Sequence, residues 1–237
     1  MDQILHAPSR SRVILFSFER FQGLLLILTG LVALFFLVEA VRFLPVRSDN
    51  MYPEAAGVLS AQRWAHGLPL YEDYRQPPYM TASFPPAWYG VLALAAKLGL
   101  QGLNKLTLFG RLLSLGCLFG VGWLGFRWNR KIGLPFWLAL LTPLFYLSLP
   151  ILIPWAVTAR PDFPGLLLVF LSLYVISLRP TKGSVLLAAA FAAVGFLIRH
   201  NAIAVPVSVS SGWHGQSGGR MRAFFVQRGA WSSVRRY

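Results

Sequence analysis

The sequence predicts an all-α protein, a polytopic transmembrane helical bundle with about five to six spans. Three observations predict this class. Hydrophobic residues make up 56% of the 237 residues. Charged residues make up 13%, about half the share typical of soluble domains. Apolar runs suited to membrane helices recur along the chain, separated by short polar clusters.

The net charge of +14 comes mostly from Lys and Arg at the ends of these apolar runs. Basic residues at such places set the orientation of membrane helices. We therefore expect membrane lipids as neighbours and no nucleic-acid partner. Residues 1–20 carry Arg10, Arg12 and Arg20, which predicts a cytoplasmic N-terminal tail on an integral membrane protein.

The transmembrane domain is predicted over residues 21–207. Its apolar runs are 21–44, 106–126, 134–156, 166–178 and 185–198, with a further apolar start at 202–209. Basic clusters at 127–131 and 179–182 mark the inner side. Three prolines, Pro143, Pro150 and Pro154, interrupt the third run. Glycines at 116, 120, 122 and 125 predict close helix packing.

The first outer loop, residues 45–84, carries four of the eight acidic residues: Asp49, Glu54, Glu72 and Asp73. A simple membrane anchor needs no such loop. A helix-like run follows at 55–65, and Pro85-Pro86 opens a short helix over 85–100. About fourteen apolar residues are too few to span a bilayer, so we expect interfacial helices in and after this loop. The same topology brings Arg160 with Asp162, and Arg199 with His200, to the outer side.

Residues 208–237 form an atypical basic tail. The tail has no Leu and no acidic residue, whereas Leu is abundant upstream. A tail that binds anionic lipid and the product of a shifted reading frame both fit this composition.

The order and spacing of the loop elements resemble the GT-C class of membrane glycosyltransferases. The similarity is to the branch of protein mannosyltransferases, aminoarabinose transferases and bacterial RgtA/B/C/D-like enzymes. The resemblance is carried by Asp49, the alanine-rich run 55–65, the turn Gly67 to Tyr71 and the Pro-Pro-aromatic element Pro85 to Tyr89. The segments ARPD at 159–162 and FLIRHNAIAVP at 196–206 extend it over about residues 20–207.

This resemblance implies a polyprenyl-phosphate-linked sugar donor and an inverting transfer to a lipid, glycan or protein acceptor. It places the reaction on the outer face of the bacterial inner membrane. Many relatives have a second acid directly after the loop Asp, where this chain has Asn50. Relatives are also considerably longer. We therefore expect this chain to hold only an amino-terminal portion and to be inactive by itself.

Sugar transfer from a lipid phosphate needs a base for the acceptor and positive charge for the leaving phosphate. The resemblance makes Asp49 the catalytic base, with Glu54 orienting the acceptor or helping to hold a metal. Arg160, Arg199 and His200 are the candidates for the donor phosphate. Asp162 and Tyr71 complete the predicted substrate-binding set. No spacing typical of a closed metal site is present, and a divalent ion bound partly by phosphate oxygens stays open.

Structural roles compete with each of these assignments. Asp49 could cap a helix, Glu54 could lie on a solvated helix face, and Arg160 could simply pair with Asp162. Arg199 and His200 could anchor the chain at the interface. The competing functions are a multi-pass transporter subunit, for which helices broken by proline would also make sense, and a non-catalytic membrane scaffold.

Overall fold

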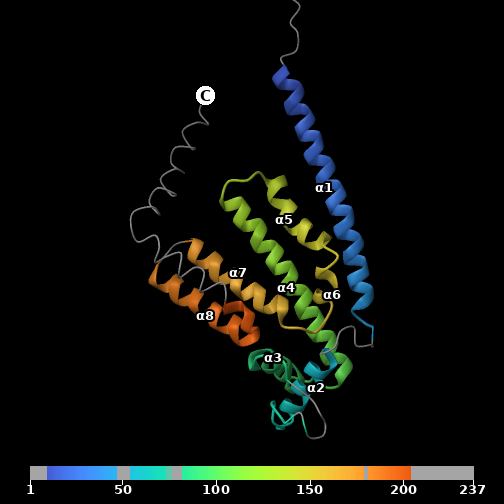
Figure 1. Ribbon diagram of the computed structural model, residues 1–237, viewed down its shortest axis with the longest axis vertical. Coiled ribbons are helices and arrows are strands. Elements are labelled where there is room, and N and C mark those ends of the chain that lie inside the picture. Colours follow the sequence, from blue (N-terminus) through green and yellow to red (C-terminus); the bar gives the residue numbers. More distant parts are fainter. Residues whose placement is uncertain (1–9, 47–53, 74, 76–81, 179–180, 204–237) are drawn as a thin grey trace, which may run out of the picture.

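The computed structural model describes residues 10–46, 54–73, 75, 82–178 and 181–203. These residues form helices and no strands, which confirms the all-α class. Figure 1 shows a bundle around α4, with α1 along one side and α2 and α3 at the lower end. The helices are α1 (Arg10–Phe43), α2 (Glu54–Ala65), α3 (Pro86–Lys97), α4 (Leu103–Lys131), α5 (Phe136–Ser148), α6 (Leu152–Ala156), α7 (Asp162–Leu178) and α8 (Lys182–Ile198), followed by a 3-10 turn, η1 (His200–Ile203).

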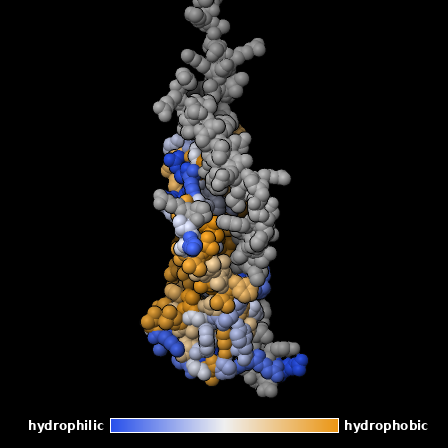
Figure 2. All heavy atoms as spheres, turned by 90° about the vertical axis from the view of Figure 1, so that its left-hand side faces the viewer, coloured by the Kyte–Doolittle hydropathy of each residue, from blue (hydrophilic) through white to orange (hydrophobic). Residues whose placement is uncertain are grey.

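Two of these helices, α1 from Arg20 and α4, are long and apolar enough to cross a membrane. The outward side of α1 shows large apolar side chains, with Ile27 and Phe35 about 60% exposed. A contiguous apolar surface of this kind is unfavourable in water and favourable against lipid tails. Figure 2 shows an apolar middle between more hydrophilic ends on the visible face. These features favour membrane association.

The predicted run 134–156 is interrupted at Pro150, as predicted, whereas the predicted interruptions at Pro143 and Pro154 are wrong, because both prolines lie within helices. The helix α5 contains Pro143 and ends at Ser148, and the short α6 starts at Leu152. Between them lies Pro150, which disfavours helical backbone at the preceding residue. Leu149 is indeed extended, with φ −81° and ψ 111°. The thirteen residues of α5 would reach only about 20 Å, less than the thickness of a bilayer core.

The glycines of α4 permit close packing at three of the four predicted positions. An added Cβ would meet Leu167 at Gly120, Pro143 at Gly122 and Thr142 at Gly125. At Gly116 it would meet nothing within 4 Å. The predicted close packing is therefore wrong for Gly116, because that position faces away from the neighbouring helices.

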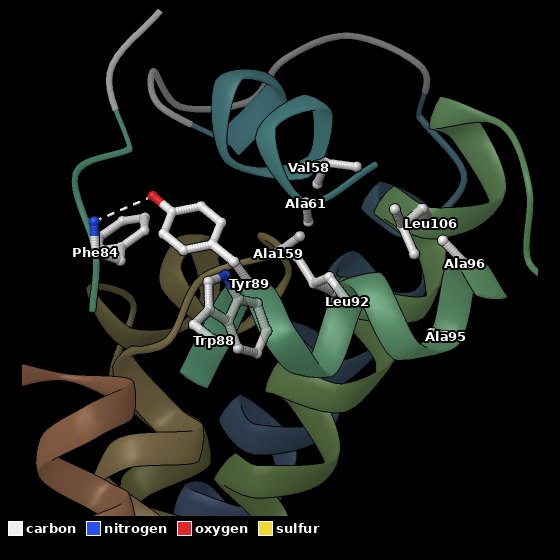
Figure 3. Packing of buried hydrophobic residues seen from close by; sticks show 10 residues of the cluster. All are labelled: Val58, Ala61, Phe84, Trp88, Tyr89, Leu92, Ala95, Ala96, Leu106 and Ala159. Atoms are coloured by element: carbon white, nitrogen blue, oxygen red, sulfur yellow. Dashed lines mark hydrogen bonds between the residues drawn. The ribbon is translucent and has the colours of Figure 1, made fainter. Parts of the chain in front are cut away.

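The two predicted short helices form in the first outer loop and directly after it. The helix α2 covers the run expected at 55–65, and α3 starts at Pro86, where proline suits the first helical turn. Figure 3 shows how α2 and α3 bury a common core. This core includes Val58 and Ala61 of α2 with Trp88 and Leu92 of α3, all fully buried.

The first turn of α8 is held by a reciprocal cap. The hydroxyl of Thr181 accepts from the backbone N–H of Ser184, and the Ser184 hydroxyl accepts from the Thr181 N–H. Replacing Thr181 with alanine removes the acceptor. We expect Thr181→Ala to lower the free energy of unfolding by about 0.5–2 kcal/mol. Denaturant unfolding in detergent checks this expectation, and an unchanged midpoint would show that the cap contributes nothing.

Candidate functional site

Two arginines converge on one carboxylate at the end of the bundle where α7 begins and α8 ends. Asp162 is the first residue of α7, and its Oδ2 accepts from Nε of Arg160 at 3.1 Å. Its Oδ1 lies 3.0 Å from a terminal guanidinium nitrogen of Arg199, the residue that follows α8. The side chains of Asp162 and Arg199 are each 21% exposed. Two guanidinium groups therefore share one carboxylate at a position that solvent or a ligand reaches.

Aromatic rings flank both guanidinium groups. The Arg160 Cζ lies 4.1 Å from the ring centroid of Trp155, close enough for a cation–π interaction. The Phe84 ring centroid lies 5.9 Å from the Cζ of Arg160 and 5.6 Å from that of Arg199. Phe84 precedes the Pro-Pro pair that opens α3, so the outer loop itself contributes a wall to this site.

Two tyrosine hydroxyls hold the backbone of Phe84. The Tyr71 hydroxyl donates to the Phe84 carbonyl, and the Phe84 N–H donates to the Tyr89 hydroxyl, each at 3.1 Å. Figure 3 shows the second of these bonds. Burial raises the pKa of both tyrosines above the usual value of 10.0, because it disfavours the phenolate. Both hydroxyls thus stay protonated at neutral pH and keep Phe84 against the arginines.

A buried ion pair contacts the backbone next to Arg160. Glu54, the first residue of α2, and Arg111 of α4 are each 1% exposed. The Glu54 Oε1 accepts from the Arg111 Nε at 2.8 Å and from the Ala159 N–H at 2.6 Å. Its Oε2 accepts from a terminal nitrogen of Arg111 at 2.6 Å. Both carboxylate oxygens are therefore occupied by protein donors.

Arg111 also binds the end of α1. Its second terminal nitrogen lies within hydrogen-bond distance of the carbonyls of Phe43, Leu44 and Val46, at 3.3, 3.1 and 2.6 Å. The last carbonyls of a helix lack partners within the helix and attract positive charge. Arg111, in the N-terminal half of α4, thus joins the end of α1 to the start of α2.

An apolar cavity of about 340 Å³ is lined by the two residues that contact the Arg160 guanidinium most closely, Trp155 and Asp162. Asp162 and Trp155 lie on its wall together with apolar side chains. The lining residues are Ile151, Leu152, Trp155, Asp162, Phe163 and Leu166. Ile151 is 69% exposed and Leu166 36%, so the cavity opens on the outer surface of the bundle. The charged side chain on its wall is Asp162, whose carboxylate is neutralised by Arg160 and Arg199, so an anionic head would have to meet the two guanidinium groups while its apolar part lies in the cavity.

The opposite end of the bundle lies one helix length away. There Lys131 of α4 donates to Ser177 of α7 at 3.3 Å. From Lys131 back to Ser114, whose hydroxyl donates to the Arg160 carbonyl at 2.9 Å, α4 rises about 25 Å. From Leu178 to Asp162, α7 rises about 24 Å. Along both helices, the arginine site thus lies about the same distance from the opposite, basic end of the bundle.

The structure brings together three of the predicted substrate-binding residues, Arg160, Asp162 and Arg199. Tyr71 joins them through Phe84. His200 is exposed in η1, and within the described residues no contact ties its side chain to the group. Glu54 is buried, so its alternative interpretation as a solvated residue is wrong. Asp49, the predicted base, lies outside the described residues.

Sequence reasoning missed Arg111, Ser114, Trp155 and Phe84. Arg111 offered a signal, since a charged residue inside a predicted span at 106–126 marks a functional or paired group. Phe84 and Trp155 offered none, because aromatic residues are common throughout such chains. Within the part of the chain that the structure describes, no group of three or more His, Cys, Asp or Glu side chains could hold a metal ion.

Comparison with protein-family models, with curated proteins and with solved structures found no match to this chain.

Proposed function

We propose that this chain binds a polyprenyl-phosphate-linked sugar and acts as a GT-C class glycosyltransferase of the bacterial inner membrane. The observation that carries the proposal is the pair of guanidinium groups, Arg160 and Arg199, on Asp162, which itself lines an open apolar cavity. Arginine suits phosphate because its planar fork can donate two parallel hydrogen bonds. An isoprenoid chain suits the cavity and the lipid beyond it.

The depth of the arginine pair supports this ligand. The pair lies about 24–25 Å along α4 and α7 from the basic end, against about 30 Å for a bilayer core. If the basic end faces the cytoplasm, the arginines lie near the outer interface. A lipid phosphate lies at that level while its chain stays in the bilayer. In this arrangement the chain has about five to six spans, counted with the broken α5–α6 pair.

The transfer exchanges one bond at the sugar. The acceptor oxygen or nitrogen forms a bond to the anomeric carbon, and the bond from that carbon to the phosphate oxygen breaks. Asp49 takes the acceptor proton. The phosphate leaves with the electron pair as polyprenyl phosphate, and Arg160 and Arg199 stabilise its added negative charge. The acceptor is a lipid, glycan or protein at the outer face.

The described carboxylates of the site do not fit a divalent cation. Both oxygens of Asp162 face guanidinium groups. Both oxygens of Glu54 accept from Arg111, and one of them also from Ala159. A cation at either residue would meet these positive groups, so no step of the transfer is derived through a metal here.

The test is selective binding of polyprenyl phosphate to the chain in lipid nanodiscs. The comparison ligand is the corresponding polyprenol, which lacks the phosphate. We expect tight binding of the phosphate and weak binding of the alcohol. Arg199→Gln should weaken phosphate binding about tenfold to a hundredfold, because a hydrogen bond with a charged partner contributes roughly 1.5–3 kcal/mol.

Arg42→Gln is the matched control for this experiment. Arg42 lies in the last turn of α1, at the same end of the bundle, is 71% exposed and pairs with Glu39 three residues earlier. Its loss should leave the affinity unchanged. Equal binding of polyprenol and polyprenyl phosphate, or full affinity in Arg199→Gln, would contradict the proposed donor site.

A further inference from the structure

The buried pair of Glu54 and Arg111 has a cost that packing alone does not explain. Removing two charges from water costs several kcal/mol for each ion, and apolar residues of similar volume are often at least as stabilising. Yet both side chains are almost fully buried at the outer end of α4, and every guanidinium nitrogen donates to a protein acceptor. We therefore looked for a role of this pair other than stabilising the fold.

The contacts of the pair converge on the backbone of Arg160. Glu54 accepts from the N–H of Ala159, the residue before Arg160. Ser114, one turn after Arg111 on α4, donates to the carbonyl of Arg160 itself. The N–H of Arg160 donates to the Thr158 carbonyl at 2.8 Å. The peptide groups on both sides of the Arg160 Cα are therefore fixed.

This fixing determines where the Arg160 side chain lies. With its backbone held, the guanidinium packs 4.1 Å from the Trp155 ring centroid and reaches Asp162. The residues that hold this backbone come from two helices: Glu54 from α2 in the outer loop, and Arg111 and Ser114 from α4 in the bundle. A change in Glu54 therefore affects the position of Arg160 through the peptide group that carries the Ala159 N–H.

We propose that Glu54 and Arg111, with Ser114, are positioning residues that set Arg160 at the phosphate site. They touch no ligand and act through the 159–160 backbone. This inference rests on the proposed function for its ligand, polyprenyl phosphate. The placement of Arg160 over Trp155, however, can be observed without any ligand.

The first readout is the fluorine NMR signal of Trp155 in protein labelled with 5-fluorotryptophan, assigned by its loss in Trp155→Phe. Arg160→Gln removes the cation over the ring and defines the shifted position of this signal. We expect Glu54→Gln to move the Trp155 signal toward that position in the absence of lipid, because the amide nitrogen of glutamine would face a donating nitrogen of Arg111 and the side chain could not keep its bond to the Ala159 N–H. The control is Glu72→Gln, which breaks the Arg63–Glu72 pair of the same loop, 2.6 Å apart. That control should leave the signal in place.

The second readout is a double-mutant cycle on polyprenyl phosphate affinity. We expect Glu54→Gln to weaken binding about tenfold, as for a hydrogen bond of about 1.5 kcal/mol. In the Arg160→Gln background the same change should have no further effect, because Glu54 acts through Arg160. Additive losses would overturn the inference.

Ser114→Ala decides the question if Glu54→Gln does not fold. This change removes one hydroxyl and should produce the same displacement of the Trp155 signal, to a smaller extent. A Trp155 signal that stays in place in folded Glu54→Gln, or in Ser114→Ala, overturns the positioning role. If the unaltered protein does not bind polyprenyl phosphate, the proposed function fails, and the fluorine signal still decides this inference.

Discussion

Replacing Arg111 with methionine should lower the free energy of unfolding by about 3–5 kcal/mol, because it leaves the Glu54 carboxylate buried without its cation. The end of α1 loses its partner as well, since Arg111 donates to three carbonyls there. A loss of this size is a large fraction of the stability of an ordinary domain. Denaturant unfolding in detergent, followed by circular dichroism, measures it.

A second variant separates the buried charge from the lost volume. Arg111→Met combined with Glu54→Gln removes both charges and keeps an amide oxygen for the N–H of Ala159. The double variant should be more stable than Arg111→Met alone. Arg42→Met is the control, because its pair with Glu39 is exposed and should contribute less than about 1 kcal/mol. Equal losses in Arg111→Met and Arg42→Met would mean that the buried pair does not stabilise the fold.

The order of the helices could be predicted from hydropathy, because each apolar run is a local property of the sequence. The short helices α2 and α3 could also be predicted, since Pro85-Pro86 and the length of each run limit what they can form. The break between α5 and α6 could be predicted only in part. Pro143 and Pro154 lie within helices, and Pro150 lies in the break, so the identity of the residue alone does not tell which proline interrupts the chain.

The site was less predictable than the helices, because its contacts join distant parts of the sequence. Glu54 and Arg111 are 57 positions apart, and Glu54 and Ala159 are 105 positions apart. No local pattern encodes such pairs. Asp162 could be paired with Arg160 from their spacing, but its second bond, to Arg199, depends on how α7 packs against α8.

The packing of α4 explains why Ala159 is where Glu54 can reach it. Gly110 faces Ala159 so closely that an added Cβ would lie 2.5 Å from the Ala159 Cβ and 3.3 Å from its Cα. A backbone atom cannot move aside as a flexible side-chain tip can. The position therefore requires glycine for close approach, and the approach sets the distance from Ala159 to Glu54.

Gly110→Ala should therefore destabilise the protein by about 1–3 kcal/mol, despite the better helix propensity of alanine. It should also weaken polyprenyl phosphate binding, because displacing Ala159 moves Arg160. Gly116→Ala, in the same helix with nothing within 4 Å, should stabilise the protein by about 0.5–1 kcal/mol.

Gly120→Ala should fall between these two, since the atoms it meets are the methyl groups of Leu167, at 2.9 and 3.1 Å. Measuring the free energy of unfolding and the phosphate affinity of all three variants tests whether the contact of Gly110 with Ala159 sets the position of Arg160. Loss of stability in Gly110→Ala with full phosphate affinity would show that the 159–160 backbone can shift without moving the arginine. In that case, the close approach of α4 serves stability alone, and the arginine site is set by Asp162 and the rings around it.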